Sequence, residues 1–281
     1  MNSQKPCAVV IVTHNSKSYL DRCMNCIKQQ SHRPSQIVIV DSGSTDTAYL
    51  KRYQNKRGVT VVLCPENIGF SSGNNVGYSH VLPACEHVLF LNPDAFLTPN
   101  FLRDASHYLS QRSHKDVGAL TGMLLGYNQA ADSPTGKYDS TGIFRTWYGR
   151  WYDRGQNESF PQVLYQKEET LPAICGALMF CRKKAIDEVL INGKDVFDPA
   201  FFMYKEDIDL SMRLRQKGWI LKYVPTLSVY HCRGWNPNRK QVPKKQRLMS
   251  ARNEMRLHAR AVSPYVVYSA LKYAAVKLFN Y

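Results

Sequence analysis

The sequence predicts an α/β protein with a mostly parallel central sheet, helices on both faces and a helical extension at the C-terminus. Three observations support this fold class. Short apolar runs alternate with amphipathic segments through the first third of the chain, as in parallel sheets covered on both sides. The 281 residues, 44% of them hydrophobic, suffice for one large domain with an appendage. From about residue 239 the chain becomes basic and helical in pattern.

The first four strands are expected where β-branched or continuous apolar runs occur. Ligands of parallel sheets bind beyond the carboxyl ends of the strands. Polar or glycine-rich sequences follow each run, namely THN, DSGSTD, PENIGFSSGNNVG and NPD, and they predict a binding site at this edge. The expected strands are 7–13, 36–41, 59–64 and 87–92, and the expected helices between them are 18–30, 45–55 and 71–82.

The second half is less regular. The pattern breaks between 126 and 170, which is rich in Gly, Ser and aromatic residues. Residues 205–218 alternate in hydrophobicity as a strand would, but the acids Glu206 and Asp207 at one end, basic residues at the other and Gly218 beyond favour a helix. Further elements are expected at 173–183, a strand running into a helix, and at 219–225 and 227–231, two short strands.

The charge is strongly positive. Lys and Arg total 37 against 22 Asp and Glu, a net charge of +15. Such an excess indicates an anionic partner, which could be nucleic acid, a phosphorylated substrate or a membrane surface. About half of it lies between Arg239 and Arg260, where eight basic residues accompany one acid, Glu254. Because no nucleic-acid-binding motif is present, we expect no nucleic-acid partner.

The cysteines and the apolar stretches predict a cytoplasmic protein. Most of the eight cysteines lie in apolar runs, as reduced buried thiols do. Cys23 and Cys26 have the spacing of a zinc or redox pair, but no second ligand pair follows, so packing is favoured. The sequence starts without a signal-peptide pattern. The longest apolar stretch, 265–279, is short for a membrane span and contains Lys272 and Lys277.

An acid at the end of an apolar strand is the first sign of chemistry. Asp94 follows the run VLFLNP, where an unpaired charge is costly. Taken singly, VDSGSTD and the glycine-rich stretch also suit ordinary strand-to-helix turns. Taken in order, VTHN, VDSGSTD, NIGFSSGNNVG, LNPD and KEDIDLSMRLRQKG resemble the family 2 glycosyltransferases, which have the GT-A nucleotide-sugar-binding fold. The resemblance runs from about Cys7 to His231 and is strongest to the bacterial branch of rhamnosyltransferases, where NPD replaces the Asp-x-Asp motif.

This resemblance implies an inverting transfer with two groups of acids. Asp207 matches the general base that takes the proton of the acceptor hydroxyl, and neighbouring Glu206 would shape the pocket or assist orientation. Asp94 would hold Mg²⁺ or Mn²⁺ against the donor diphosphate, with His231 at the position of a third ligand. Asn92 stands in the place of the first Asp, so one negative charge is missing and metal dependence is left open.

The resemblance also places the donor and the acceptor. The donor's nucleotide and sugar would lie against residues of four strand ends, with Asp41 bonded to the pyrimidine or ribose: Thr13, His14, Asn15, Asp41, Asn67, Gly69, Gly73, Asn75 and Asn92. Residues 126–170 would form an acceptor-side insertion, because sugars stack on aromatic rings such as Trp147, Tyr148 and Trp151. The alternative is a loop that packs its own aromatics.

The chain divides into a glycosyltransferase domain, 1–238, and a basic amphipathic tail, 239–281. A helix at 265–279 beside a polybasic segment suits peripheral contact with the inner face of a bacterial membrane. The alternative is a helical pair packed on the core or in an oligomer interface.

The first expectation for function is transfer of rhamnose from dTDP-rhamnose to a glycan or polyprenyl-linked saccharide, in the synthesis of a cell-surface polysaccharide such as lipopolysaccharide. UDP-galactose or UDP-N-acetylglucosamine is an alternative donor. A catalytically silent nucleotide-sugar-binding protein is a second alternative, favoured by Asn92. A nucleotidyltransferase, which releases pyrophosphate, would leave Asp207 without a role.

Overall fold

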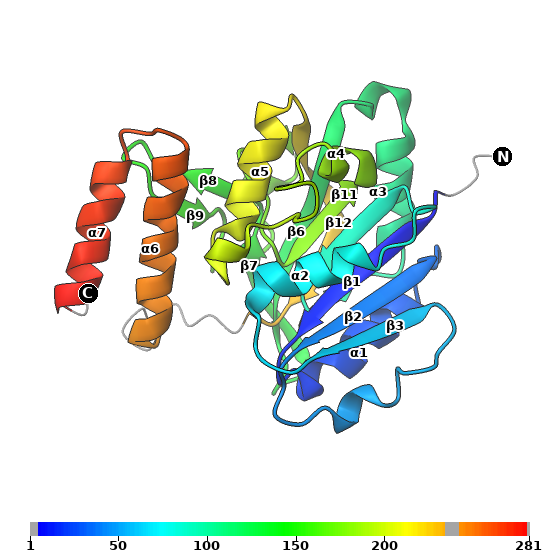
Figure 1. The fold of residues 1–281 in the computed structure, drawn as a ribbon. Coiled ribbons are helices and arrows are strands. Elements are labelled where there is room, and N and C mark those ends of the chain that lie inside the picture. The colour runs from blue at the N-terminus through cyan, green and yellow to red at the C-terminus, as the bar shows by residue number, and fades with distance from the viewer. Residues whose placement is uncertain (1–4, 234–241, 280–281) are drawn as a thin grey trace.

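The computed structural model describes residues 5–233 and 242–279. One twisted sheet forms its centre (Figure 1). The strands of this sheet are β1 (Cys7–Thr13), β2 (Gln36–Ser42), β3 (Val59–Cys64), β4 (His87–Leu91), β5 (Ala95–Leu97), β6 (Val117–Asn128), β7 (Ser133–Ser140), β10 (Glu169–Thr170), β11 (Leu178–Arg182) and β12 (Ile220–His231).

The main path through the sheet is β10-β12-β6-β11-β4-β1-β2-β3, with β5 paired to β12 and β7 to β6. Six of the eight strands on this path, all except β10 and β11, point the same way. The predicted mostly parallel sheet is therefore confirmed, and the carboxyl ends of β1, β2 and β4 meet at one edge.

Helices cover both faces of the sheet, as predicted. One apolar cluster includes Leu20 and Leu102, and a second on the other face includes Tyr78, Ile186 and Leu210. The helices are α1 (Lys17–Lys28), α2 (Gly69–Ser79), α3 (Phe101–Ser110), α4 (Lys183–Asp187), α5 (Glu206–Gln216), α6 (Lys244–Arg260) and α7 (Val266–Phe279), with 3-10 turns η1 (Ala48–Leu50), η2 (Arg112–His114), η3 (Val163–Tyr165) and η4 (Pro199–Phe201).

Two local predictions were wrong. The helix expected at 45–55 is only the turn η1, because the Asp46 side chain accepts the Ala48 N–H at 2.8 Å and so competes with helical bonding. The two short strands expected after Gly218 form one strand, β12, whose register against β6 shifts between Tyr223 and Ser228.

The aromatic-rich segment 126–170 holds β7 and a separate hairpin of β8 (Ile143–Arg145) and β9 (Trp151–Asp153). Figure 1 shows this hairpin beside α6. The His258 ring of α6 lies 3.0 Å from the Gly149 carbonyl oxygen in the hairpin turn. The C-terminal helices are thus packed against the insertion.

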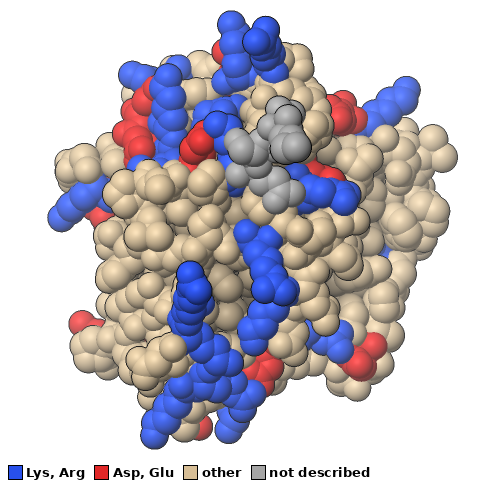
Figure 2. All heavy atoms as spheres, turned by 90° about the vertical axis from the view of Figure 1, so that its right-hand side faces the viewer, with Lys and Arg blue, Asp and Glu red and all other residues tan. Residues whose placement is uncertain are grey.

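The helices α6 and α7 lie side by side at one edge of the molecule (Figure 1). Within the two described ranges, no helix combines the length and hydrophobicity needed to cross a bilayer. Figure 2 views the side away from α6 and α7 and shows Lys and Arg there in several separate groups. The positive charge is therefore not confined to the tail.

Candidate active site

The site begins at the carboxyl ends of β4 and β12. Residues after β4 form β5, which pairs antiparallel with the end of β12 and sets Ala95 opposite His231. This pairing brings Asp94 Oδ1 to 3.3 Å from His231 Nε2. The Asn92 amide nitrogen lies 3.5 Å from the same ring nitrogen. The structure thus brings together the two predicted metal ligands and the amide that replaces the first Asp.

His231 is oriented by a second acid. Its Nδ1 lies 2.8 Å from Asp139 Oδ2 of β7, and both side chains are buried. Arg233 binds the other oxygen of Asp139 at 3.1 Å and also pairs with Asp153 of β9. A continuous chain of charged groups therefore runs from β4 to the β8–β9 hairpin.

These contacts set the ionisation of the pair. Burial acts to lower the pKa of His231, but the Asp94 charge and hydrogen bonds to Asp139 and Asp94 raise the pKa to about 10. Burial acts to raise the pKa of Asp94, and His231 reverses this, so that the pKa lies below its ordinary value. Without a cation the two side chains are therefore an ion pair.

The second group of acids opens helix α5. Asp207 accepts the Gly176 N–H on Oδ2 at 2.9 Å and its neighbour's N–H, that of Ile208, on Oδ1 at 2.8 Å. Burial raises the pKa of Asp207, although the Gly176 amide and the Lys205 charge oppose the rise. Glu206 is more deeply buried, and burial and then the Asp207 charge raise its pKa well above the ordinary value. Asp207 is therefore the more accessible carboxylate of the two.

Two connections join the acids of α5 to the Asp94 end of the site. The Gly176 amide holds Asp207, and the carbonyl of the next residue, Ala177, accepts the Asn92 N–H at 3.1 Å. In addition, the charge of Asp153, which pairs with Arg233, contributes to the raised pKa of Asp207. These links place the start of α5 near the Asp94–His231 pair, and a single site that uses both groups of acids stays a prediction.

The Asp94–His231 pair suits a divalent cation. A carboxylate oxygen and a ring nitrogen face one another, and Asp139 fixes the ring from behind, as carboxylates do for many metal-bound histidines. A nitrogen ligand favours Mn²⁺ over Mg²⁺. Within the described ranges, no group of three His, Cys, Asp or Glu side chains surrounds a metal position. Oxygen atoms of the donor would have to complete the coordination.

The donor-side residues of β1 lie at the predicted sheet edge. Thr13 is fully buried and bonds Tyr49 at 2.9 Å, and His14 Nδ1 lies 2.7 Å from the Ser42 carbonyl oxygen. Asn15 has φ 53° and accepts the Thr45 N–H at 3.0 Å. These bonds join the ends of β1 and β2, where nucleotide contact stays a prediction.

The remaining donor-side residues have bonds within the protein. Asp41 is fully buried and accepts the Ser44 N–H at 2.9 Å. Asn67 accepts bonds from the Ser42 hydroxyl at 3.1 Å and from the Gly69 N–H at 3.0 Å. Each of these bonds stabilises a turn after β2 or β3, and contact of these residues with the donor stays a prediction.

Gly69, Gly73 and Asn75 have clear packing roles in α2. A Cβ on Gly69 would lie 2.6 Å from the Phe202 ring, and one on Gly73 would lie 2.7 Å from Val12 Cγ1. The Asn75 amide bonds both the N–H and the C=O of Phe197. These contacts explain the three residues by the close approach of α2 to its neighbours, and their contact with the donor stays a prediction.

The aromatic side chains predicted on the acceptor side differ in their exposure to solvent. Trp147 is 86% exposed, whereas Trp151 is only 6% exposed. The Trp151 N–H lies 3.4 Å from Glu254 of α6, and the Tyr148 ring packs on Tyr268 of α7. Of the three predicted rings, Trp147 is therefore the one most open to a ligand.

Comparison with known proteins now fixes the family. The sequence profile described as "Glycosyl transferase family 2" matches residues 8–190. The chain belongs to this family. It is 27% identical over 245 residues to the N-acetylglucosaminyl-diphospho-decaprenol L-rhamnosyltransferase of Mycobacterium tuberculosis, covering 79% of this chain and 75% of the relative. It is 24% identical over 231 residues to the rhamnosyltransferase WbbL of Escherichia coli, covering 79% and 82%.

Solved glycosyltransferases share the GT-A fold of this chain. GalNAc-T7, crystallised with UDP, GalNAc and Mn²⁺, superposes with a TM-score of 0.66 at 18% identity, covering 97% of this chain and 54% of that one. The mannosyltransferase PcManGT of Pyrobaculum calidifontis, crystallised with GDP-Man and Mn²⁺, gives 0.61 at 16% identity, covering 99% and 71%. The chain thus spans little more than half the length of the GalNAc-T7 structure.

Sequence reasoning missed three residues of this glycosyltransferase site: Asp139, Asp153 and Arg233. Asp139 is the last residue but one of β7 and Asp153 is the last residue of β9, and each acid follows a tyrosine, in the sequences KYDS and WYD. Buried acids in strands are rare without a partner, so these positions carried a usable signal. Arg233 follows His231 by two residues, and only the fold reveals that it neutralises both acids.

Proposed function

We propose that this glycosyltransferase inverts the anomeric carbon of a nucleoside diphosphate sugar, with Asp207 as the general base. Two observations support the proposal: the charged groups that run from Asp94 and His231 to Asp153, and the backbone bonds by which the neighbouring residues Gly176 and Ala177 contact Asp207 and Asn92. Inverting transfer needs charge stabilisation on one side of the sugar and a proton acceptor on the other. A site with both groups supplies these requirements.

Asp207 has the properties of a base in this reaction. Two backbone N–H groups fix its carboxylate, and its pKa lies above the ordinary value, which strengthens it as a proton acceptor near neutral pH. A divalent cation held by Asp94 and His231 would supply positive charge against the diphosphate leaving group. Glu206 then serves to shape the pocket beside the base.

Two unpaired oxygens support a hydroxyl-rich acceptor. Glu206 Oε2 and Asp153 Oδ1 are buried without a hydrogen-bond partner among the described residues. Buried carboxylate oxygens normally accept hydrogen bonds. Both atoms are closed to solvent, so saccharide hydroxyls would reach them only after neighbouring side chains move, whereas the exposed Trp147 ring could stack on a sugar face directly.

For the donor we propose dTDP-rhamnose, because two relatives are named as rhamnosyltransferases. The acceptor would be a glycan or polyprenyl-linked saccharide in the synthesis of a cell-surface polysaccharide such as lipopolysaccharide, consistent with the decaprenol-linked compound in one relative's name. A UDP-hexose donor is the alternative, since TarS of S. aureus, a structural neighbour at 18% identity, was crystallised with UDP-GlcNAc. A silent nucleotide-sugar-binding protein is the second alternative, since Asn92 removes one acid.

The test is nucleoside diphosphate release from dTDP-rhamnose, UDP-galactose and UDP-N-acetylglucosamine with Mg²⁺, Mn²⁺ or EDTA. We expect release from dTDP-rhamnose that needs a cation and falls about 10²–10⁴-fold in Asp207→Asn, the usual contribution of a general base. Asn25→Asp, on an exposed position of α1, is the control. If Asp207→Asn releases nucleotide as fast as the wild type, Asp207 is not the general base. If no donor gives release, the catalytically silent alternative is favoured.

We further propose that α7 contacts an anionic membrane surface. Two of its polar residues turn inward, since Ser269 is fully buried and Lys272 pairs with buried Glu254 of α6, whereas Lys277 is exposed. Its apolar residues Val267 and Leu271 are exposed, and so is Leu278. A helix with its apolar side outward beside basic residues suits an interfacial position, which would place a cytoplasmic enzyme at its lipid-linked acceptor.

A further inference from the structure

The loop that leads into the catalytic acids has an unusual backbone. Phe202, Tyr204 and Lys205 have φ angles of 59°, 74° and 75°, and the helix carrying Asp207 starts directly after them. Such conformations are unfavourable for residues other than glycine and persist only where neighbouring groups fix them. Something outside the loop must therefore hold it.

Two groups outside the loop hold it: one is the Ser71 N–H of α2, which donates to the Phe202 carbonyl oxygen at 3.1 Å, and the other is Asn253 of α6. Its side chain is fully buried, and Nδ2 lies 2.8 Å, 2.9 Å and 3.0 Å from the carbonyl oxygens of Phe201, Met203 and Tyr204. An amide nitrogen has two N–H donors, so three converging carbonyls share them. Without this nitrogen the three carbonyl oxygens would lose the donor that they share, although the Phe201 oxygen also accepts the Met203 N–H at 2.6 Å.

The orientation of the Asn253 amide follows from these contacts. Its Oδ1 has no partner among the described residues. The reversed amide would set that oxygen against three carbonyl oxygens, which repel it. The structure therefore requires a donor at this position.

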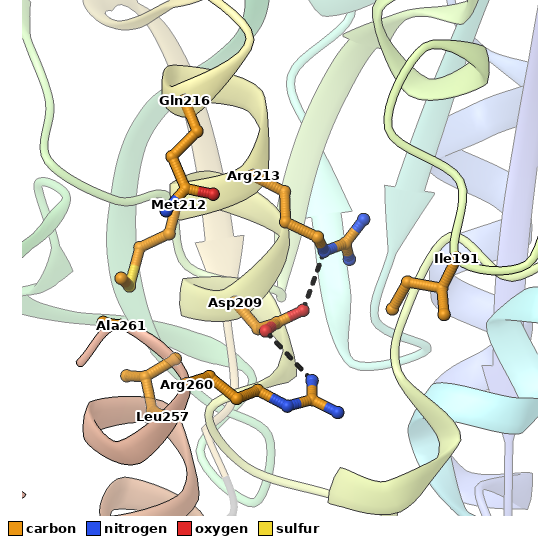
Figure 3. A pocket seen from close by; sticks show the side chains of 8 residues that line it. All are labelled: Ile191, Asp209, Met212, Arg213, Gln216, Leu257, Arg260 and Ala261. Atoms are coloured by element: carbon orange, nitrogen blue, oxygen red, sulfur yellow. Dashed lines mark hydrogen bonds and ion pairs between the residues drawn. The ribbon is translucent and has the colours of Figure 1, made fainter.

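Two further turns of α6 hold the segment just before this loop. Arg256 donates to the Ala200 carbonyl oxygen, and Arg260 pairs with Asp198. The guanidinium groups of both arginines lie within 6 Å of the Phe201 ring, at 5.8 and 5.7 Å. Figure 3 shows Arg260 reaching from α6 to Asp209 of α5, at 3.4 Å. The basic face of α6 is thus engaged with the loop and with α5.

We propose that α6 is part of the frame of the active site and that Asn253 is a positioning residue for Asp207. The C-terminal segment then has a task in catalysis besides any contact with a membrane. Only the expected effect of Asn253 on catalysis rests on the proposed function. The support of the loop by α6 is independent of the reaction.

The first test measures the loop directly. Asn253→Asp keeps the shape of the side chain and replaces its donors by an acceptor. We expect hydrogen exchange at the amides of 202–207 to rise about tenfold or more, the effect of one lost hydrogen bond on local opening. The amides of β1 should keep their wild-type rates. Asn25→Asp, the same change on the exposed face of α1, should leave both regions unchanged.

The second test measures catalysis with dTDP-rhamnose, or with UDP-N-acetylglucosamine if that donor gives the larger release. We expect kcat to fall about 10–100-fold in Asn253→Asp, because small displacements of a catalytic group cost this much, while KM for the donor stays within about threefold. Asn253→Ser, which restores one donor, should recover part of kcat. It also serves as the second variant if Asn253→Asp does not fold.

Unchanged loop exchange in a folded variant would overturn the proposal. An increase spread evenly over β1 and the loop would also overturn it, because that pattern reports a general loss of stability. If the wild-type enzyme releases no nucleotide from any donor, the proposed function fails, and the exchange measurement alone decides the role of Asn253.

Discussion

At the residue scale, both acidic and basic side chains influence the ionisation of Asp207. Burial raises its pKa, Asp153 adds to the rise, and Lys205 acts against it. Glu206 and the Cys175 thiol are the other titratable groups that interact with it. Because a base works only when ionised, activity should fall with decreasing pH as Asp207 takes up a proton, at a higher pH than an exposed aspartate would give.

Lys205→Met tests this arrangement. Removing the positive charge raises the pKa of Asp207 further, so the acid limb of kcat/KM against pH should move upward by about 0.5–1 pH unit. The matched control is Lys184→Met in α4, whose side chain is largely exposed. A limb that stays in place, or moves downward, would show that Asp207 is not the group that titrates.

At the scale of elements, α2 lies unusually close to β1. The place of a Cβ on Gly73 is 2.7 Å from Val12 Cγ1, and on Gly77 it is 2.3 Å from Val10 Cγ1. Both valines are β-branched residues in a buried strand and have little freedom to move. The glycines of α2 therefore set the distance between this helix and the sheet.

Gly73→Ala should lower the free energy of unfolding, because overpacking costs about 1–3 kcal/mol and helix propensity returns at most ~1 kcal/mol. Urea unfolding measures the change. In a Val12→Ala background the obstructing methyl groups are gone, so adding Gly73→Ala should not lower the free energy of unfolding further. If Gly73 instead borders the donor, the double variant will bind dTDP more weakly than Val12→Ala alone.

At the scale of the whole molecule, α7 exposes several apolar residues, while Ser269 is buried and Lys272 pairs with Glu254 of α6. Leu271 is 67% exposed, and fully burying a leucine contributes about 1.5–3 kcal/mol. Truncation would be a poor test of membrane contact, because α6 contributes Leu257 to the core and Asn253 to the catalytic loop. Substitutions on the exposed face of α7 leave these contacts intact.

Leu271→Ser combined with Leu278→Ser should weaken binding to phosphatidylglycerol-containing vesicles by about tenfold or more, measured by cosedimentation at low salt. Leu82→Ser, at a partly exposed leucine of the main domain, should have no effect. Equal cosedimentation of the two proteins would contradict the membrane contact. A loss of self-association in the α7 variant without a change in vesicle binding would identify the face as an interface between copies.

Much of the fold and part of the site follow from local sequence. The strand runs of β1 to β4 were predicted because buried parallel strands are continuously apolar. Helix α5 was predicted from its charge distribution alone, since acids at the start and bases near the end suit the helix dipole. The helix expected at 45–55 failed because a single Asp46 bond outweighs weak helical periodicity, and the two strands expected after Gly218 proved to be one strand, β12.

The sequence by itself determined the first four strands of the sheet and their polar carboxyl ends, because each of these is a pattern over neighbouring residues, and the family resemblance singled out Asp94 and Asp207 as candidates. Only the tertiary structure decided that Asp139 orients His231, that Asn253 holds the loop before Asp207 and that α7 turns its apolar side outward. Those contacts join segments far apart in the chain. Hydrophobic periodicity and local propensity describe one segment at a time, so they cannot predict which distant residue a side chain contacts.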